Sequence, residues 1–212
     1  GYVVQVYKNG KWTTAVKNTG INKTTAEVNG LNPGAEYKLR VMCFKDGTEV
    51  IYGVPAEITV STLPSVVAGF KTKSKSYNSI TLQWNKNTSA TGYELQKWNG
   101  KKWVALTKIT KNSTTTYTVK SLKASATYKY RIRAYKTIGK ATQYSGYKEL
   151  SVNTNPSNMS GFKAKSKSYN SITLQWNKNT SATGYELQKW NGKKWVALTK
   201  ITKNSTTTYT VK

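Results

Sequence analysis

The sequence predicts an all-β chain built from tandem copies of one sandwich domain. Three observations predict it: apolar and polar residues alternate in short runs, clusters of Asn, Gly, Ser and Lys separate these runs, and a long stretch of sequence occurs twice. Runs with a period of two residues, bounded by turn residues at short intervals, are typical of β-sandwiches. No run has the 3.6-residue period of an amphipathic helix.

One stretch of the chain occurs twice almost without change. Residues 69–120 and residues 161–212 are each 52 residues long, lie 92 residues apart and differ only where Thr72 is replaced by Ala164. An internal period of this size indicates an array of domains rather than one large domain.

The beginning of the chain is a more divergent copy of the same pattern. Its residues 31–41, LNPGAEYKLRV, correspond to residues 122–132, LKASATYKYRI. Pro64 and Pro156 stand at the same place before the two later copies. We therefore expect three domains or partial domains, named the first, central and third segments: residues 1–63, residues 64–155 and residues 156–212.

The central segment is expected to contain all seven strands of a sandwich. The first segment begins at the third strand, and the third segment contains the first to fifth strands. In the central segment, the clearest alternation lies in residues 78–84, 92–98 and 127–135. The residues expected to face the interior there are Ile80, Leu82, Trp84, Tyr93, Leu95, Tyr128, Tyr130, Ile132 and Ala134. Strand edges left open in partial domains tend to pair with other chains.

Three spaced features carry a family resemblance. Trp84 ends the second expected strand, Tyr93 opens the third, and Leu122 lies six residues before Tyr128. With these features the segment resembles a fibronectin type III domain, and the pair Leu122 and Tyr128 is similar to a tyrosine corner. The resemblance implies tandem immunoglobulin-like sandwiches of seven strands, with incomplete end domains. The lysine-rich, disulfide-free sequence is similar to arrays in secreted or surface proteins of Gram-positive bacteria.

A set of large side chains is expected to form the structural core. In the first segment Cys43 matches the inward position of Ala134, which predicts a buried, structural thiol. Because Cys43 is the only cysteine, no intramolecular disulfide can form. The expected core residues are Trp84, Tyr93, Leu122, Tyr128, Trp176, Tyr185, Leu31, Tyr37 and Cys43.

The residues that usually carry catalysis are scarce. The chain has no histidine, the commonest general base and metal ligand. The central segment has two acids, Glu94 and Glu149, and no accompanying catalytic motif. Glycine-rich phosphate loops, CxxC and GxSxG are also absent. We therefore expect a protein that is not an enzyme and that holds no cofactor or metal.

The stretch KWNGKKWVAL, at residues 97–106, recurs at residues 189–198 and has a looser counterpart in the first segment. Asn-Gly predicts a hairpin turn between the two tryptophans. The aromatic residues either form a shelf on which a sugar ring stacks, or a brace in which arginines of the next strand stack on them. The divergent copy keeps both aromatics and Arg40, which favours the brace. The shelf or brace residues are Trp98, Trp103, Arg131, Arg133, Trp190, Trp195, Tyr7 and Trp12.

Positive charge is concentrated in the repeated part of the chain. The whole chain carries +26, of which residues 1–62 carry +2, residues 69–154 carry +15 and residues 155–212 carry +9. Lysines on an edge strand guard it against aggregation, and they also attract anionic polymers. Nucleic acid is disfavoured because no base-stacking or groove-reading motif is present. The candidate polyanion contacts are Lys71, Lys73, Lys75, Lys101, Lys102, Lys163, Lys165 and Lys167.

These observations favour a non-catalytic extracellular array that acts as a spacer, stalk, fibre or adhesion segment of a bacterial surface protein. Two alternatives stay open: a carbohydrate-binding accessory module of a secreted glycoside hydrolase, and a subunit of a surface filament with strand complementation between chains. The expected partners are anionic or neutral cell-surface polysaccharides, neighbouring repeats or identical chains. No run of about 18 apolar residues occurs, so no membrane span is expected.

Overall fold

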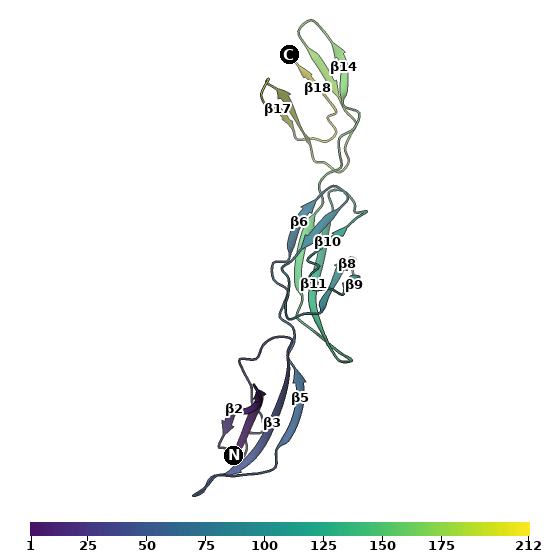
Figure 1. Cartoon of the computed structure of the whole chain (residues 1–212). Helices are drawn as coiled ribbons and strands as arrows, with labels where there is room; N and C mark the ends of the chain where they lie inside the picture. The colour runs from purple at the N-terminus through teal and green to yellow at the C-terminus, as the bar shows by residue number, and fades with distance from the viewer. The chain divides into compact units, whose positions relative to one another are not determined.

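The computed structural model describes residues 1–212, and all of its regular elements are β-strands (Figure 1). The predicted all-β fold is therefore confirmed. No helix that could span a membrane is found in the structure.

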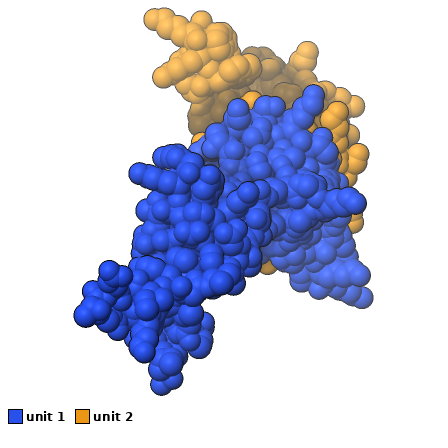
Figure 2. All heavy atoms as spheres, turned by 60° about the horizontal axis from the view of Figure 1, so that its bottom comes forward, with its two compact units in different colours: residues 1–70, 84–115, 131–149 blue, residues 71–83, 116–130, 150–212 orange.

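The chain divides into two compact units (Figure 2). Unit 1 comprises residues 1–70, 84–115 and 131–149, and unit 2 comprises residues 71–83, 116–130 and 150–212.

The first segment of the chain forms a five-stranded antiparallel sheet in unit 1. Its strand order is β2-β1-β3-β4, and β5 also pairs with β3. The turn between β1 and β2 is Asn9-Gly10, with φ of 51° and 78°, the combination that a tight hairpin needs. The strands are β1 (Tyr2–Lys8), β2 (Lys11–Asn18), β3 (Glu36–Lys45), β4 (Ile51–Tyr52) and β5 (Ala56–Ser61).

One prediction about this sheet is wrong: Cys43 is exposed rather than buried. It lies on the same face of β3 as Val41, which is itself 39% exposed, and no second sheet of this segment covers that face. The opposite face of β3 holds the buried cluster instead, made of Val3, Met42 and Phe44. A single sheet can bury apolar side chains well on only one of its faces. In this sheet the buried face is the one that carries Met42 and Phe44.

A second five-stranded sheet contains most of the remaining strands of unit 1. Its order is β12-β11-β8-β9, and β13 also pairs with β11. The hairpin between β8 and β9 closes on Trp98 opposite Trp103, and the Asn99 side-chain oxygen accepts the N–H groups of Lys101 and Lys102. The strands are β8 (Gly92–Trp98), β9 (Trp103–Ile109), β11 (Thr127–Ile138), β12 (Ala141–Tyr144) and β13 (Lys148–Asn153).

Tyr93 is the best-anchored buried side chain of unit 1. It is fully buried, and its ring meets that of Trp84 edge to face, with centroids 5.4 Å apart. Its hydroxyl accepts the backbone N–H of Asn87 at 2.8 Å and donates to the carbonyl of Asn112 at 2.9 Å. Both hydrogen-bonding roles of the buried hydroxyl are therefore satisfied, which fixes two loops to the strand.

Unit 2 contains the three-stranded sheet β10-β7-β6. Ile80 and Leu82 on the middle strand are fully buried. On the edge strand the register shifts between Thr72 and Ser74, which is a β-bulge. The strands are β6 (Lys71–Lys75), β7 (Ile80–Gln83) and β10 (Thr116–Val119).

Two tyrosines at the start of β11 belong to unit 2. The Tyr128 hydroxyl accepts the backbone N–H of Lys123 at 2.8 Å, which is the hydrogen bond of a tyrosine corner. The Tyr128 ring stacks on that of Tyr130, with centroids 6.4 Å apart. Burial raises the pKa of Tyr130 to about 12, with a smaller contribution from Tyr128.

The third segment also lies in unit 2. It forms a three-stranded sheet, β14-β15-β18, and a two-stranded sheet, β16-β17. Trp176, Tyr185 and Leu187 form its buried cluster. The strands are β14 (Lys163–Lys167), β15 (Ile172–Gln175), β16 (Tyr185–Trp190), β17 (Trp195–Ile201) and β18 (Thr208–Val211).

The other expected core residues divide into two groups. Trp84, Tyr93, Trp176 and Tyr185 are buried. Leu31, Tyr37, Leu122 and Tyr128 are half-buried. The two tyrosines of the second group direct their hydroxyls to backbone N–H groups of nearby loops, which keeps part of each ring at the surface.

Candidate functional site

The candidate site is a row of stacked arginine and aromatic side chains on one face of the β12-β11-β8-β9 sheet. The Arg131 guanidinium carbon lies 4.6 Å from the ring centre of Trp103 and 3.9 Å from that of Tyr147. The Arg133 guanidinium carbon lies 4.8 Å from the ring centre of Tyr147 and 3.7 Å from that of Tyr144. Each guanidinium thus contacts two rings. The residues of this arginine–aromatic ladder are Trp98, Trp103, Arg131, Tyr147, Arg133 and Tyr144.

Trp98 stands at one end of the ladder. Its ring meets Trp103 edge to face at a centroid distance of 5.5 Å, and the residue is 37% exposed. The stacking arginine lies on Trp103, not on Trp98. Two tryptophans directly opposite each other at a hairpin end stabilise the strand pair.

Polar groups on β8 hold the two arginines in place. The Nε of Arg131 donates to Oε1 of Gln96 at 2.8 Å. Arg133 donates to Oε2 of Glu94 from Nε at 3.0 Å and from Nη2 at 2.7 Å. The Lys108 ammonium lies 3.9 Å from the other oxygen of Glu94. The Glu94 carboxylate therefore pairs with two cations.

The first segment has a shorter version of the ladder. Tyr7 and Trp12 meet edge to face at 5.2 Å, and the Arg40 guanidinium carbon lies 4.3 Å from the Trp12 ring centre. The Nε of Arg40 donates to Gln5 at 2.8 Å, as Arg131 does to Gln96. The ladder is therefore built twice from sequences that otherwise diverge.

In the third segment the tryptophan pair lacks an arginine. Trp190 and Trp195 meet edge to face at 5.6 Å, as in the other two segments. They are 50% and 64% exposed, respectively. Glu186, the counterpart of Glu94, accepts a hydrogen bond from Gln188 at 2.6 Å instead of an arginine.

Sequence reasoning missed two members of the ladder. Tyr144 and Tyr147 lie at the end of β12 and just before β13, in the stretch YSGY. The sequence did offer one signal for them, since two tyrosines follow the strand that carries Arg131 and Arg133. Their contact depends on where the chain turns after β12, which alternation alone does not indicate.

The candidate polyanion contacts lie apart from the ladder. Lys71, Lys73 and Lys75 are exposed on β6, an edge strand of its sheet. Their counterparts Lys163, Lys165 and Lys167 are exposed on β14, also an edge strand. Lys101 and Lys102 are exposed in the β8–β9 turn. None of these lysines has a salt-bridge partner, so their charge is available to solvent.

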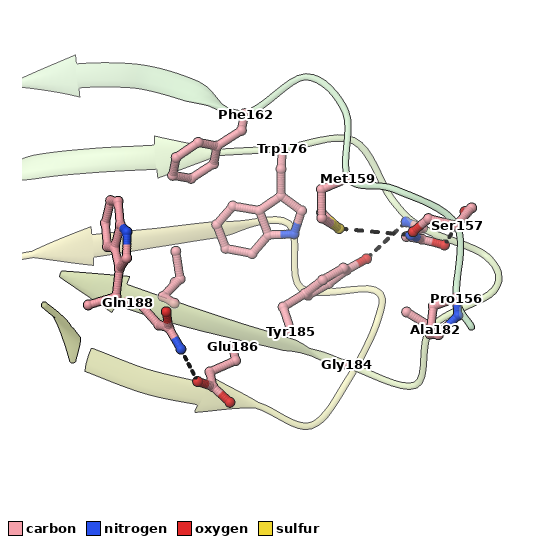
Figure 3. A pocket seen from close by; sticks show the side chains of 13 residues that line it. Pro156, Ser157, Met159, Phe162, Trp176, Ala182, Gly184, Tyr185, Glu186 and Gln188 are labelled. Atoms are coloured by element: carbon pink, nitrogen blue, oxygen red, sulfur yellow. Dashed lines mark hydrogen bonds between the residues drawn. The ribbon is translucent and has the colours of Figure 1, made fainter. Parts of the chain in front are cut away.

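The third segment also contains a cavity of about 560 Å³. Figure 3 shows Trp176 and Tyr185 pointing into the space between the strands, with Phe162 on one side and Gln188 and Glu186 on the other. No group of three or more His, Cys, Asp or Glu side chains gathers here or elsewhere in the chain. The cavity wall is mainly apolar, and its polar side chains are Glu186, Gln188, Ser157 and Asn179.

Arg131 offers a direct test of the ladder. Replacing it by lysine keeps the charge but removes the planar group that contacts two rings and Gln96. We expect the free energy of unfolding to fall by about 1 kcal/mol. Urea denaturation with Lys129→Arg as the control, an exposed position on the same strand, measures this. Equal stability of Arg131→Lys and the wild type would mean that the stack stabilises nothing.

Comparisons with known proteins match parts of this chain. Residues 65–147 match the family model described as fibronectin type III domain. The chain is 26% identical over 192 residues to Chitinase A1 of Niallia circulans, which covers 85% of this chain and 25% of that protein. It therefore spans about a quarter of the length of this relative.

Solved structures were found at lower identity. A two-domain fibronectin type III segment of chicken tenascin is 20% identical, covers 72% of this chain and 83% of its own, and has a TM-score of 0.48. The FN1–FN3 domains of chicken CNTN1 are 16% identical, cover 99% of this chain and 78% of their own, and have a TM-score of 0.36.

Proposed function

On the premise that the chain carries fibronectin type III domains, with residues 65–147 as the matched one, we propose that it is a non-catalytic segment of an extracellular bacterial protein. Its repeats act as a spacer or stalk that holds other parts of that protein apart. Since this fold hosts many functions, the proposal depends on the surface of these particular repeats.

The observation that supports the proposal is that an arginine covers one tryptophan of the hairpin in each of two segments. Arg131 lies on Trp103, and Arg40 lies on Trp12 in the divergent first segment. A sugar ring binds a tryptophan by stacking on a free face, which a guanidinium here occupies. Two divergent copies with the same covered arrangement support a structural brace rather than a ligand shelf.

A second candidate function is carbohydrate binding as an accessory of a glycoside hydrolase. Two observations favour it: the relative named Chitinase A1, and Trp98, which is 37% exposed and which no arginine covers. In this candidate Trp98 binds the sugar.

We also propose that the lysine-bearing edge strands attract anionic polysaccharide. Three exposed lysines on β6 recur on β14, and residues 69–154 carry a net charge of +15 against +2 for residues 1–62. Attraction of this kind depends on charge density and salt, not on a shaped pocket. It would hold a stalk close to an anionic cell surface.

One chromatography experiment tests these proposals together. The full chain is passed over insoluble chitin and over heparin, as a model polyanion, in a salt gradient. We expect no retention on chitin. We expect retention on heparin at low salt that disappears as the screening length falls from about 10 Å at 0.1 M to about 3 Å at 1 M.

Two triple variants with reversed charges test which lysines contact heparin. Changing Lys71, Lys73 and Lys75 to glutamate should give earlier elution from heparin than the same change at Lys8, Lys11 and Lys23 of the first segment. Equal elution of the two triple variants would refute the edge-strand proposal. Salt-resistant retention on chitin that Trp98→Ala abolishes would refute the spacer and support the second candidate.

A further inference from the structure

A proline stands at each junction between the segments. Pro64 lies after β5 of the first segment, and Pro156 lies after β13 of the central segment. The stretches around them are TLPSVVA at residues 62–68 and TNPSNMS at residues 154–160, which share only Thr, Pro and Ser. Domains in tandem usually move relative to one another, so the hydrogen bonds on either side of each proline determine how much motion is left.

The peptide group before each proline is held by the preceding segment. The carbonyl oxygen of Leu63 accepts the backbone N–H of Gly34 at 2.9 Å. In the same way, the carbonyl oxygen of Asn155 accepts the backbone N–H of Ser125 at 3.0 Å. The two donors are equivalent loop residues, and both have a positive φ, of 62° and 49°. One loop conformation therefore fixes this peptide group at both junctions.

The peptide group after each proline is held by the following segment. The N–H of Ser65 donates to Oγ of Ser89 at 2.9 Å. The carbonyl oxygen of Ser65 accepts from Nδ2 of Asn87 at 2.7 Å, and this asparagine is only 7% exposed. Ser157 makes the two equivalent hydrogen bonds, both 2.7 Å long. The same anchor is therefore built at both junctions.

We infer that each junction is a hinge with a single rotatable bond, the Cα–C bond of its proline. The inference rests on the spacer proposed above. The two peptide groups that flank Pro64 are planar, and each is held by its own segment. Only φ and ψ of Pro64 lie between them, and the proline ring fixes φ at about −65°. The angle ψ alone is left to vary, and steric clashes restrict it to two ranges. The same holds for Pro156.

Such a hinge suits a spacer. A flexible linker behaves as a random coil and lets the joined domains approach one another freely. A junction with one rotatable bond lets them turn about one axis only. The two junctions share this design although the residues around the prolines differ, which indicates that the hydrogen bonds and the proline define the hinge.

Distances between spin labels on the full chain test the hinge. Cys43→Ser removes the one native thiol, which is exposed. Cysteines at Lys11 and Lys101 then report on the first junction, and cysteines at Lys101 and Lys193 report on the second; all three lysines are exposed. Double electron–electron resonance is expected to give one or two narrow peaks for each pair. A broad, continuous distribution across either junction would overturn the inference.

Glycine substitutions identify the bond. Pro64→Gly frees φ and is expected to widen the distribution across the first junction about twofold, without changing the second. Pro156→Gly should do the reverse, so each variant is the control for the other. Pro55→Gly, at an exposed proline outside the junctions, should change neither. Unchanged widths in the two junction variants would overturn the role of the prolines. A broad distribution in a chain that chitin does not retain would overturn the hinge and leave the spacer standing.

Discussion

Replacing Trp84 by alanine is expected to lower the free energy of unfolding by about 3–5 kcal/mol, the largest effect of any single substitution considered. Trp84 is 4% exposed, and its ring contacts Phe70 and Tyr93 at centroid distances of 6.4 and 5.4 Å. Removing it leaves a cavity that neighbouring strands cannot fill. The free energy of unfolding of a domain is only about 5–15 kcal/mol, so this loss is a large fraction of it.

Native-state hydrogen exchange of the full chain measures this effect. Amides of β8 and β11 should exchange faster in Trp84→Ala, and those of β1 and β3 should not change. The matched control is Trp176→Ala, the same substitution in the same local sequence, which should leave β8 and β11 unaffected. A loss under about 1 kcal/mol in Trp84→Ala would mean that this tryptophan is not a core residue.

Glu94→Gln is expected to have the second largest effect, a loss of about 2 kcal/mol. The substitution keeps the shape of the side chain but removes the charge that pairs with Arg133 at 2.7 Å. The two side chains are only 19% and 25% exposed, so water compensates poorly for the lost partner. The half-buried guanidinium then keeps its stacking contacts without a counter-charge.

The repeat provides the control for this experiment. Glu186→Gln removes the same charge from the same sequence context, but Glu186 is exposed and has no arginine partner. We expect it to change stability by less than about 0.5 kcal/mol. Urea denaturation of both variants gives their free energies of unfolding, at low salt and at about 1 M salt. Salt screens an ion pair at the surface much more than a partly buried one, so the comparison distinguishes the two. Equal small losses at the two positions would contradict the structural role of the pair.

Much of the fold could be predicted because alternation and turn residues are local signals. The period of two in residues 127–135, the Asn-Gly turns and the hydrogen-bonding tyrosine at position 128 all depend on neighbours in sequence. Cys43 shows where such signals fail. It was expected to face the interior, but the buried cluster lies on the opposite face of β3. Which face of a strand is buried depends on what covers it, which local sequence does not encode.

The candidate site was predicted only in part, for a related reason. Trp98, Trp103, Arg131 and Arg133 were recognised because hairpin register and strand parity place them on one surface. Which ring each arginine contacts depends on the path of the chain between β12 and β13. That path brings Tyr147 between the two arginines, and no short-range pattern specifies it.

We propose that the tryptophans of the central segment brace the fold and do not bind a ligand. The most direct test is a titration of the full chain with N-acetylglucosamine oligosaccharides, followed by the NMR signals of the tryptophan indoles. We predict no saturable shift for the indoles of Trp98 and Trp103. A saturable shift of either indole, lost when Trp98 is replaced by alanine in a folded protein, would contradict it.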